Sequence, residues 1–150
     1  MTQEEKQLLL KDLCARLPYG VVLYTGSPYG GNWTELISID TSSEQVMTLY
    51  NGEVHSIEEV KPYLRPMSSM TEEEREEIEV FIFNEWFQED SCKIDKEGWI
   101  EILANYDVSG IDPCFCSDYV DWLNEHHFDY RGLIEKGLAL EAKDGMYETE

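Results

Sequence analysis

Positive charge is the scarcest property of this sequence. The 150 residues contain 11 lysines and arginines against 32 aspartates and glutamates, which gives a formal net charge of −21. Proteins that bind nucleic acid directly neutralise its phosphates with basic side chains, so this balance argues against direct nucleic-acid binding. An acidic body instead favours a basic protein partner, or imitation of the charge of nucleic acid.

Long hydrophobic runs are also missing. The N-terminal stretch MTQEEKQLLLKDL holds only a run of three leucines, preceded by two glutamates where a signal peptide would carry positive charge. No apolar stretch approaches the roughly 20 residues that a membrane-spanning helix needs. Four cysteines without a signal peptide are typical of reduced thiols. We therefore expect a cytoplasmic protein that does not associate with a membrane.

The sequence lacks the common catalytic motifs. It contains no Gly-x-Ser-x-Gly elbow, no phosphate-binding glycine loop and no zinc-protease helix motif. Cys14 falls beside the leucine stripe of the first predicted helix, where we expect a small buried hydrophobe. Cys114 and Cys116 have one residue between them, which is closer than in most zinc sites, and adjacent His126 and His127 on a helix would point about 100° apart. No metal or other cofactor is therefore expected.

The first 66 residues predict a helix followed by a small sheet. Thr2 and Glu5 form a capping-box pattern, and leucines at helical spacing predict a helix over residues 3–16. Residues 20–57 predict an antiparallel meander of about four short strands, because apolar and polar residues alternate and Asn-Gly at 51–52 is a strong hairpin signal. The segment KPYLRPMSSM at 61–70 contains two prolines and predicts an irregular connector.

Residues 67–150 predict a mainly helical layer. A second capping box, at Thr71 and Glu74, opens a helix whose second half, through Phe87, is apolar nearly all round. Further helices are predicted over residues 96–106 and 117–124, and a helical turn near Gly137 precedes a short final strand over 138–142. The predicted fold class is α+β, in one domain over residues 1–150, with three to four helices after the sheet.

Three of the four arginines lie within three residues of a tyrosine: Arg16 with Tyr19, Arg65 with Tyr63, and Arg131 with Tyr130. Two interpretations of these pairs stay open. Arginine stacked on tyrosine is a common packing device, worth about 0.5–2 kcal/mol. Alternatively the three segments converge on a binding site, because a guanidinium group suits carboxylate or phosphate and tyrosine rings stack on a ligand or grip a partner.

Three blocks of the sequence, DLCARLPYGVVLY, VKPYLRPMSSMTEEE and HHFDYRGLIEKGLALEA, resemble recurring blocks in an uncharacterised family of small proteins from gut Bacteroidales phages, prophages and mobile elements. The resemblance implies a bacterial cytoplasm and a phage or mobile-element origin, and it implies no activity. The blocks contain all the candidate ligand-binding or partner-binding residues: Arg16, Tyr19, Tyr63, Arg65, His126, His127, Tyr130 and Arg131.

These observations predict a non-enzymatic acidic accessory protein that binds a host or phage protein. The acidic segment at residues 72–79 and the aromatic residues that follow it would contact this partner. One such partner is a nucleic-acid-binding protein whose basic face the acidic segment would occupy. An alternative is a protein that binds or sequesters a small anionic ligand, such as a nucleotide signal, through the Tyr–Arg segments. A hydrolase that uses His126 or His127 is the third interpretation.

Overall fold

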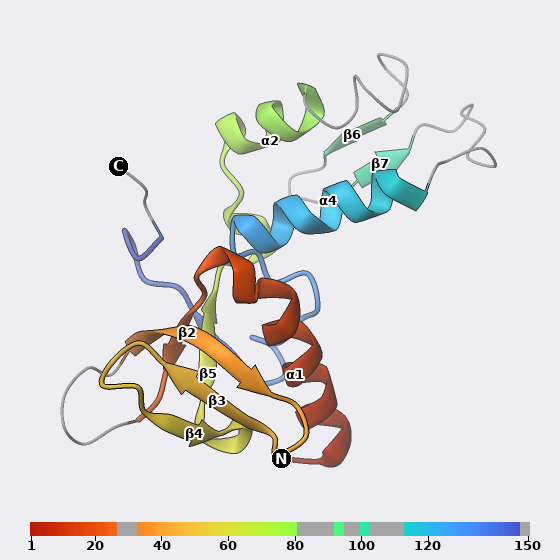
Figure 1. Cartoon of the computed structure of the whole chain (residues 1–150). Coiled ribbons are helices and arrows are strands. Elements are labelled where there is room, and N and C mark those ends of the chain that lie inside the picture. The colour runs from red at the N-terminus through yellow and green to blue at the C-terminus, as the bar shows by residue number, and fades with distance from the viewer. Residues whose placement is uncertain (27–32, 81–91, 95–99, 103–112, 148–150) are drawn as a thin grey trace. The chain divides into compact units, whose positions relative to one another are not determined.

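The computed structural model spans residues 1–150 and describes residues 1–26, 33–80, 92–94, 100–102 and 113–147 (Figure 1). The fold is α+β, as predicted, with an N-terminal helix, a mixed six-stranded sheet and further helices. The chain divides into two compact units. The first contains Met1–Arg65 and Asn124–Glu150, and the second contains Pro66–Leu123. Residues 124–150 thus group with the N-terminal sheet, whereas the sequence-based division placed them with the helical layer.

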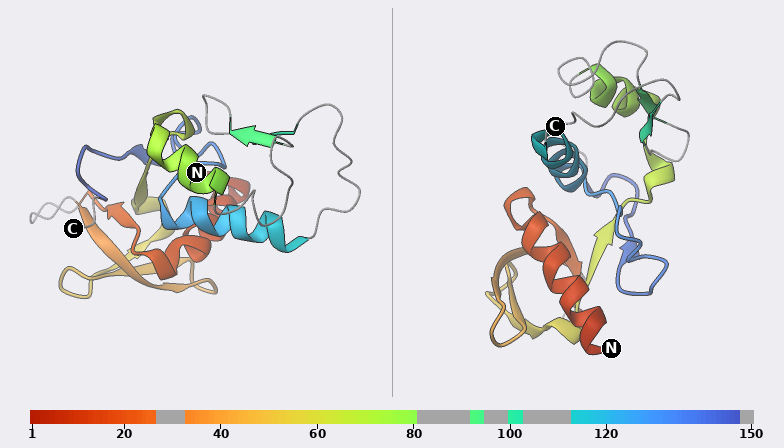
Figure 2. Two further views of the ribbon diagram at one scale, coloured as in Figure 1. Left: turned by 90° about the horizontal axis from the view of Figure 1, so that it is seen from above. Right: turned by 90° about the vertical axis from the view of Figure 1, so that its right-hand side faces the viewer.

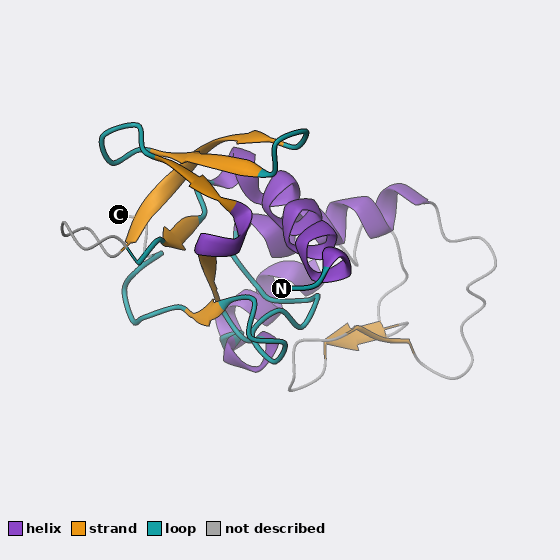
Figure 3. Cartoon of the chain, turned by 90° about the horizontal axis from the view of Figure 1, so that it is seen from below, coloured by secondary structure: helices purple, strands orange, loops and turns teal. Residues whose placement is uncertain are grey.

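The first unit begins with helix α1, Gln3–Arg16, as predicted. The capping box forms, because the Thr2 hydroxyl accepts from the Glu5 amide at 3.1 Å while the Glu5 carboxylate accepts from the Thr2 amide at 2.7 Å. Leu9 and Leu13 are fully buried, and they pack α1 onto the strands of this unit (Figures 1 and 3). A 3₁₀ turn, Leu17–Tyr19, then leads to Gly20, which adopts a left-handed φ of 75°.

The sheet has the strand order β4-β3-β2-β1-β5-β8. Its first four strands form the predicted antiparallel meander: β1 Val22–Tyr24, β2 Trp33–Asp40, β3 Gln45–Thr48 and β4 Val54–Ser56. The register between β2 and β3 shifts between Leu36 and Ser38, so that Leu36 and Ile39 both contact the core. A 3₁₀ turn, Ile57–Glu59, follows β4.

The prediction of an irregular connector over residues 61–70 was wrong for its first four residues, and a 3₁₀ turn, Met67–Ser69, occupies part of the rest. Residues Lys61–Leu64 form β5, which pairs with β1 on one side and with β8, Leu140–Glu141, on the other. Pro62 is compatible with this strand because β8 pairs only with Tyr63 and Leu64, and therefore Pro62 lies outside the paired stretch on that side. The predicted final strand is confirmed as β8, and it runs parallel to β5. The residues that precede it form hydrogen-bonded turns, in which the Lys136 amide donates to the Gly132 carbonyl at 3.3 Å, as the predicted helical turn near Gly137 requires.

The core of the first unit lies between α1 and the sheet, and segment 133–139 contributes to it (Figure 2). Thirteen buried apolar side chains from these elements form one cluster: Leu9, Leu10, Leu13, Val21, Leu23, Leu36, Val46, Ile57, Val60, Leu64, Leu133, Leu138 and Ala139. Burial of one such side chain stabilises the fold by about 1.5–3 kcal/mol. This core fixes the backbone on which the candidate site is built.

The second unit contains a 3₁₀ turn Met67–Ser69, helix α2 Glu72–Ile78, a hairpin of β6 Cys92–Ile94 and β7 Ile100–Ile102, and most of helix α4 Pro113–Glu125. The Thr71–Glu74 capping box is confirmed. None of the helices in the described part of the chain is long and apolar enough to cross a bilayer.

Two helix predictions in this unit need correction. The helix expected over residues 96–106 is contradicted at Ile100–Ile102, which form a strand, and its remaining residues lie outside the described part. A short apolar run such as Ile-Glu-Ile fits both a helix and a strand, and pairing with β6 decides between them. The helix expected from residue 117 begins earlier, at Pro113, a residue well suited to a first helical turn. The apolar residues 81–87 lie outside the described residues.

Candidate functional site

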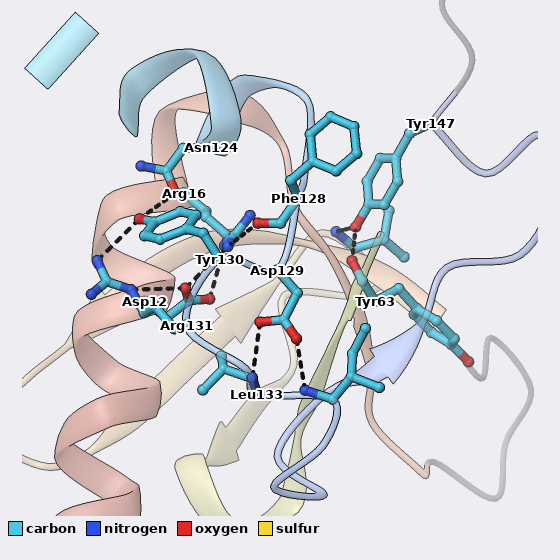
Figure 4. A network of polar contacts seen from close by, with 12 residues as sticks. Asp12, Arg16, Tyr63, Asn124, Phe128, Asp129, Tyr130, Arg131, Leu133 and Tyr147 are labelled. Carbon is cyan, nitrogen blue, oxygen red and sulfur yellow. Dashed lines mark hydrogen bonds and ion pairs between the residues drawn. The ribbon is translucent and has the colours of Figure 1, made fainter. Parts of the chain in front are cut away.

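Asp12 and two of the tyrosine-flanked arginines form one buried polar cluster in the first unit (Figure 4). The Asp12 carboxylate accepts from Nε of Arg16 at 2.8 Å, from Nη2 of Arg16 at 3.1 Å, and from Nε of Arg131 at 3.1 Å. Asp12 and Arg16 are fully buried, whereas the Arg131 side chain keeps 20% of its surface exposed. One carboxylate thus pairs with two guanidinium groups, one from its own helix and one from a distant part of the chain.

Tyr130 lies between the two arginines and completes the cluster. The Arg16 and Arg131 guanidinium carbons lie 5.4 and 4.9 Å from the centre of its ring. Its hydroxyl accepts from Nη2 of Arg131 at 3.1 Å and donates to Oδ1 of Asn124 at 2.9 Å. Nη2 of Arg16 also donates to the Phe128 carbonyl at 2.6 Å, so the cluster attaches α1 to segment 124–131. For Arg16, Tyr130 and Arg131 the geometry favours the packing interpretation.

Arg65 belongs to a second set of contacts, on the neighbouring segment. Its backbone forms a parallel bridge with Phe128, in which the Arg65 amide donates to the His127 carbonyl and its carbonyl accepts from the Asp129 amide, both at 2.8 Å. The Arg65 guanidinium lies 4.2 Å from the centre of the Phe128 ring, and its Nη1 donates to the His126 carbonyl at 3.4 Å. Segment 126–129 therefore contacts both arginines: the Phe128 carbonyl accepts from Arg16, and the Phe128 backbone and ring contact Arg65.

A pocket of about 480 Å³ opens beside Arg65, and those of its lining residues that the structure describes belong to the first unit. This volume lies within the range typical of small-molecule sites. Four of the eight predicted residues line it, namely Tyr19, Arg65, His126 and His127. The other lining residues are Pro18, Gly20, Glu35, Glu125 and Tyr147. Arg16, Tyr63, Tyr130 and Arg131 do not line it, so the structure brings together half of the predicted set.

His127 is the most constrained residue of the pocket. It has a left-handed φ of 64°, which is unusual for a residue other than glycine, and its side chain is 7% exposed. Burial, and then the neighbouring charge of Arg16, lowers the pKa of His127 to about 4, so the ring is neutral at neutral pH. Within the described part of the chain its Nδ1 has no hydrogen-bond partner. A buried polar atom without a partner costs about 1–3 kcal/mol.

Tyr147 is a lining residue that the sequence did not reveal. Its ring stacks on His127, with ring centres 3.6 Å apart and 15° between the planes. Its hydroxyl donates to the Tyr63 carbonyl at 2.6 Å and accepts from the Val22 amide at 2.9 Å. The phenol thus bridges β1 and β5 just beyond their paired residues, and burial raises its pKa. Nothing in the polar C-terminal stretch signals this role. Tyr63 itself is buried in β5, and Lys143 approaches its ring at 5.9 Å.

The second feature of the first unit is an apolar surface on the sheet. Side chains that alternate with core residues point away from the core, and five of them are large, hydrophobic and 37–62% exposed: Trp33, Ile37, Met47, Leu49 and Val54, here called the outer face. Met47 pairs in register with Val54 on β4 and with Ser38 on β2. The Leu49 amide donates to the Glu35 carbonyl at 2.9 Å, which places Leu49 beside β2. The five residues therefore lie on neighbouring strands of one sheet.

The other residues singled out from the sequence have different surroundings. Glu72, Glu73, Glu76 and Glu77 are surface residues of α2, and the aromatic residues expected beside them lie outside the described part. Cys14 is exposed, so the prediction of a buried position was wrong: its place in α1 faces away from Leu9 and Leu13. The described residues hold no group of three or more potential metal ligands, and the side chains of residues 114 and 116 are not among them.

No family model matches this chain, and neither the curated proteins nor the solved structures contain a match to it.

Proposed function

We propose that this chain is a non-enzymatic binding protein whose outer face docks a basic protein. The observation that carries the proposal is the exposure of five large apolar side chains on one sheet surface, with Leu49 62% and Val54 53% exposed. Large contiguous apolar surfaces are rare on monomeric soluble proteins and mark interaction sites. Trp33 and Met47 are of the types enriched at interface centres, where a partner excludes water from them.

The charge of the residues around the outer face indicates that its partner is basic. Between Leu17 and Val60 the sequence has no lysine or arginine, whereas it has six acids: Glu35, Asp40, Glu44, Glu53, Glu58 and Glu59. Lys6 of α1 pairs with two of them, Glu44 at 3.8 Å and Glu58 at 3.1 Å, so the segment remains acidic through the other four. Asp40 is held ionised, because hydrogen bonds from Ser42 and Ser43 lower its pKa to about 2. A second copy with the same face and a net charge of −21 would be repelled, whereas an apolar surface ringed by lysines and arginines would be attracted.

The acidic segment of α2 supports the same class of partner. Glu72–Ile78 carries five glutamates and a single arginine, and the Arg75 side chain is paired with Glu72 at 3.2 Å. Such a surface would add long-range attraction for a basic protein, including one whose basic face binds nucleic acid. With the resemblance of three sequence blocks to phage and mobile-element proteins, we propose a host or phage protein as the partner and the bacterial cytoplasm as the compartment.

Affinity capture from a bacterial host, followed by binding measurements on the purified candidate, tests the proposal. Leu49→Glu and Val54→Glu place charge on the outer face without removing a core side chain, because both residues are exposed. Val80→Glu is the matched control, since Val80 is 63% exposed and belongs to the second unit. We expect a basic partner whose affinity falls at least about 10-fold with either outer-face variant, falls with added salt, and is unchanged by Val80→Glu. Equal binding by all variants would contradict the proposal.

A further inference from the structure

We propose that the occupant of the outer face is a single amphipathic α-helix whose apolar stripe is flanked by lysines and arginines. This inference rests on the proposed function, because it names the part of the basic partner that lies against the outer face. The sheet edges argue against addition of a partner strand. The dimensions of the outer face argue against a second sheet, and the charge of the chain argues against a second copy.

The two edges of the six-stranded sheet are short. The edge strand β4 has three residues, and the amide of the last one, Ser56, already donates to the Glu59 carboxylate at 3.2 Å. At the opposite edge, β8 has two residues. Strands that pair in globular proteins are usually about five to six residues long. A partner strand would therefore gain few backbone hydrogen bonds at either edge, and the partner is better placed over the outer face.

The outer face is the exposed side of strands whose other side packs on a helix. Leu36 of β2 and Val46 of β3 belong to the same core cluster as Leu13 of α1. Ile37 and Met47, which follow them in the sequence, point to the opposite side of the sheet and are 43% and 37% exposed. An apolar sheet face is buried by a further layer, which is either a helix or a second sheet. The occupant of the outer face is therefore one of these two.

The dimensions of the outer face match one helix. Neighbouring strands lie about 4.8 Å apart, so β2, β3 and β4 together span about 10 Å. Along β2, Trp33 and Ile37 are separated by four residues, or about 13 Å. A helix is about 10 Å wide and rises about 5.4 Å per turn, so about two to three turns cover this area. A second sheet of the usual size, about four to six strands, would extend well beyond it.

The charge of the chain determines which residues should flank the apolar stripe of this helix. Glu35 and Asp40 are exposed residues of β2, and Glu53 immediately precedes β4. Lysines and arginines on both edges of the docked helix would lie close to these acids. A second copy does not supply such a helix from its second unit, because α2 carries five glutamates and one arginine, and α4 has three acids and no lysine or arginine.

The test uses the full chain and three synthetic peptides of about 18 residues, a length at which an amphipathic helix can form. The first contains only leucine and lysine, with leucines at i, i+3, i+4 and i+7, which is the helical period. The second has the same composition, but leucine and lysine alternate, which is the strand period. The third has the helical pattern with glutamate in place of every lysine. Fluorescence anisotropy of the labelled peptides at physiological salt gives the affinities.

We expect the helical lysine peptide to bind at least about 10-fold more tightly than either of the other two. Leu49→Glu and Val54→Glu should each weaken this binding at least about 10-fold, although each adds a negative charge. Binding that depended on charge alone would instead be strengthened by these two substitutions. Val80→Glu, in the second unit, is the matched control and should leave the affinity unchanged. Melting temperatures establish that each variant is folded.

Equal binding of the two lysine peptides, or an unchanged affinity in the folded Leu49→Glu and Val54→Glu variants, would overturn the inference. Capture from the bacterial host separates this failure from a failure of the proposed function. If a captured basic protein loses affinity with Leu49→Glu while the helical peptide binds no better than its isomer, the inference is wrong and the proposed function stands. If neither the captured protein nor the peptide responds to Leu49→Glu, both are wrong.

Discussion

The Asp12 carboxylate binds Arg131 across 119 residues of sequence, at 3.1 Å, while it also holds Arg16 one helical turn away at 2.8 Å. This relationship joins the first helix to the segment that forms one wall of the pocket. Arg16 and Arg131 both pair with this buried carboxylate and both pack on Tyr130, so Arg16 uses a tyrosine distant in sequence and not its neighbour Tyr19. Neither arginine is among the described residues that line the pocket.

Removal of the Asp12 carboxylate should be the most damaging change in this cluster. Asp12→Ala leaves the fully buried Arg16 without its charged partner, and an uncompensated buried charge costs about 3–5 kcal/mol. Chemical denaturation should show a loss of unfolding free energy in this range. Asp144→Ala, at an exposed position, is the control and should change stability by less than about 0.5 kcal/mol. A small effect of Asp12→Ala would contradict the structural role.

Substitution of Arg16 and of Arg131 should destabilise the protein to different extents, because the two side chains differ in burial. Arg16→Met removes a fully buried side chain that donates three hydrogen bonds, to Asp12 and to the Phe128 carbonyl, and we expect a loss of at least about 2 kcal/mol. Arg131→Met removes a partly exposed partner, so its loss should be about 1 kcal/mol. The melting temperatures of the two variants give the comparison. Equal effects, or a larger effect at Arg131, would show that burial does not set the order.

Tyr147→Phe should destabilise the first unit without changing the size of the ring. The hydroxyl satisfies the Tyr63 carbonyl and the Val22 amide, and its loss leaves both backbone groups without this partner. We expect a loss of about 1–3 kcal/mol of unfolding free energy. Tyr50→Phe is the control, since Tyr50 is 41% exposed. If the two substitutions have the same effect, the bridge between β1 and β5 contributes nothing to stability.

Acid should destabilise the protein through His127. The pKa of His127 is lowered from 6.5 to about 4 in the folded state, so the unfolded state binds the proton more readily. This contribution is fully present above about pH 6.5 and is lost as the pH falls toward 4, for a total of about 3 kcal/mol. His127→Asn removes the titration and keeps a residue that tolerates a left-handed φ. Denaturation at pH 7.5 and at pH 4.5 should show a smaller pH effect in the variant than in the wild type.

Much of the fold could be predicted from local signals. The two capping boxes and the leucine spacing fixed the beginning of α1 and of α2, and the Asn-Gly turn placed β3 and β4 correctly. The strand at Lys61–Leu64 could not be predicted, because Pro62 within it and Pro66 just after it argue against a paired strand unless the partners and their extent are known. Pairing between β5 and β8 is a contact over more than 70 residues, and no local pattern encodes it.

The candidate site was predictable only in part. Of the three pairs, Arg131 and Tyr130 are shown in direct contact, whereas Arg16 packs on Tyr130 and Arg65 on Phe128. Proximity in sequence also does not reveal whether an arginine pairs with a buried carboxylate, as Arg16 does with Asp12, or lines a pocket, as Arg65 does. Tyr147 contributes through a contact with Tyr63 across 84 residues. The outer face could not be predicted, because alternation of apolar and polar residues identifies a strand but does not show that side chains on both faces of the sheet are apolar.

The most direct test of the proposed function places a photo-crosslinking amino acid at position 47, inside the outer face, and at position 80 as a control in the second unit. The proteins are expressed in a bacterial host, irradiated, and their adducts identified by mass spectrometry. The proposal predicts an adduct from position 47 with a basic protein, which is absent from position 80 and is lost when Leu49→Glu is added. Adducts only with a second copy of the chain, or the same adducts from both positions, would contradict it.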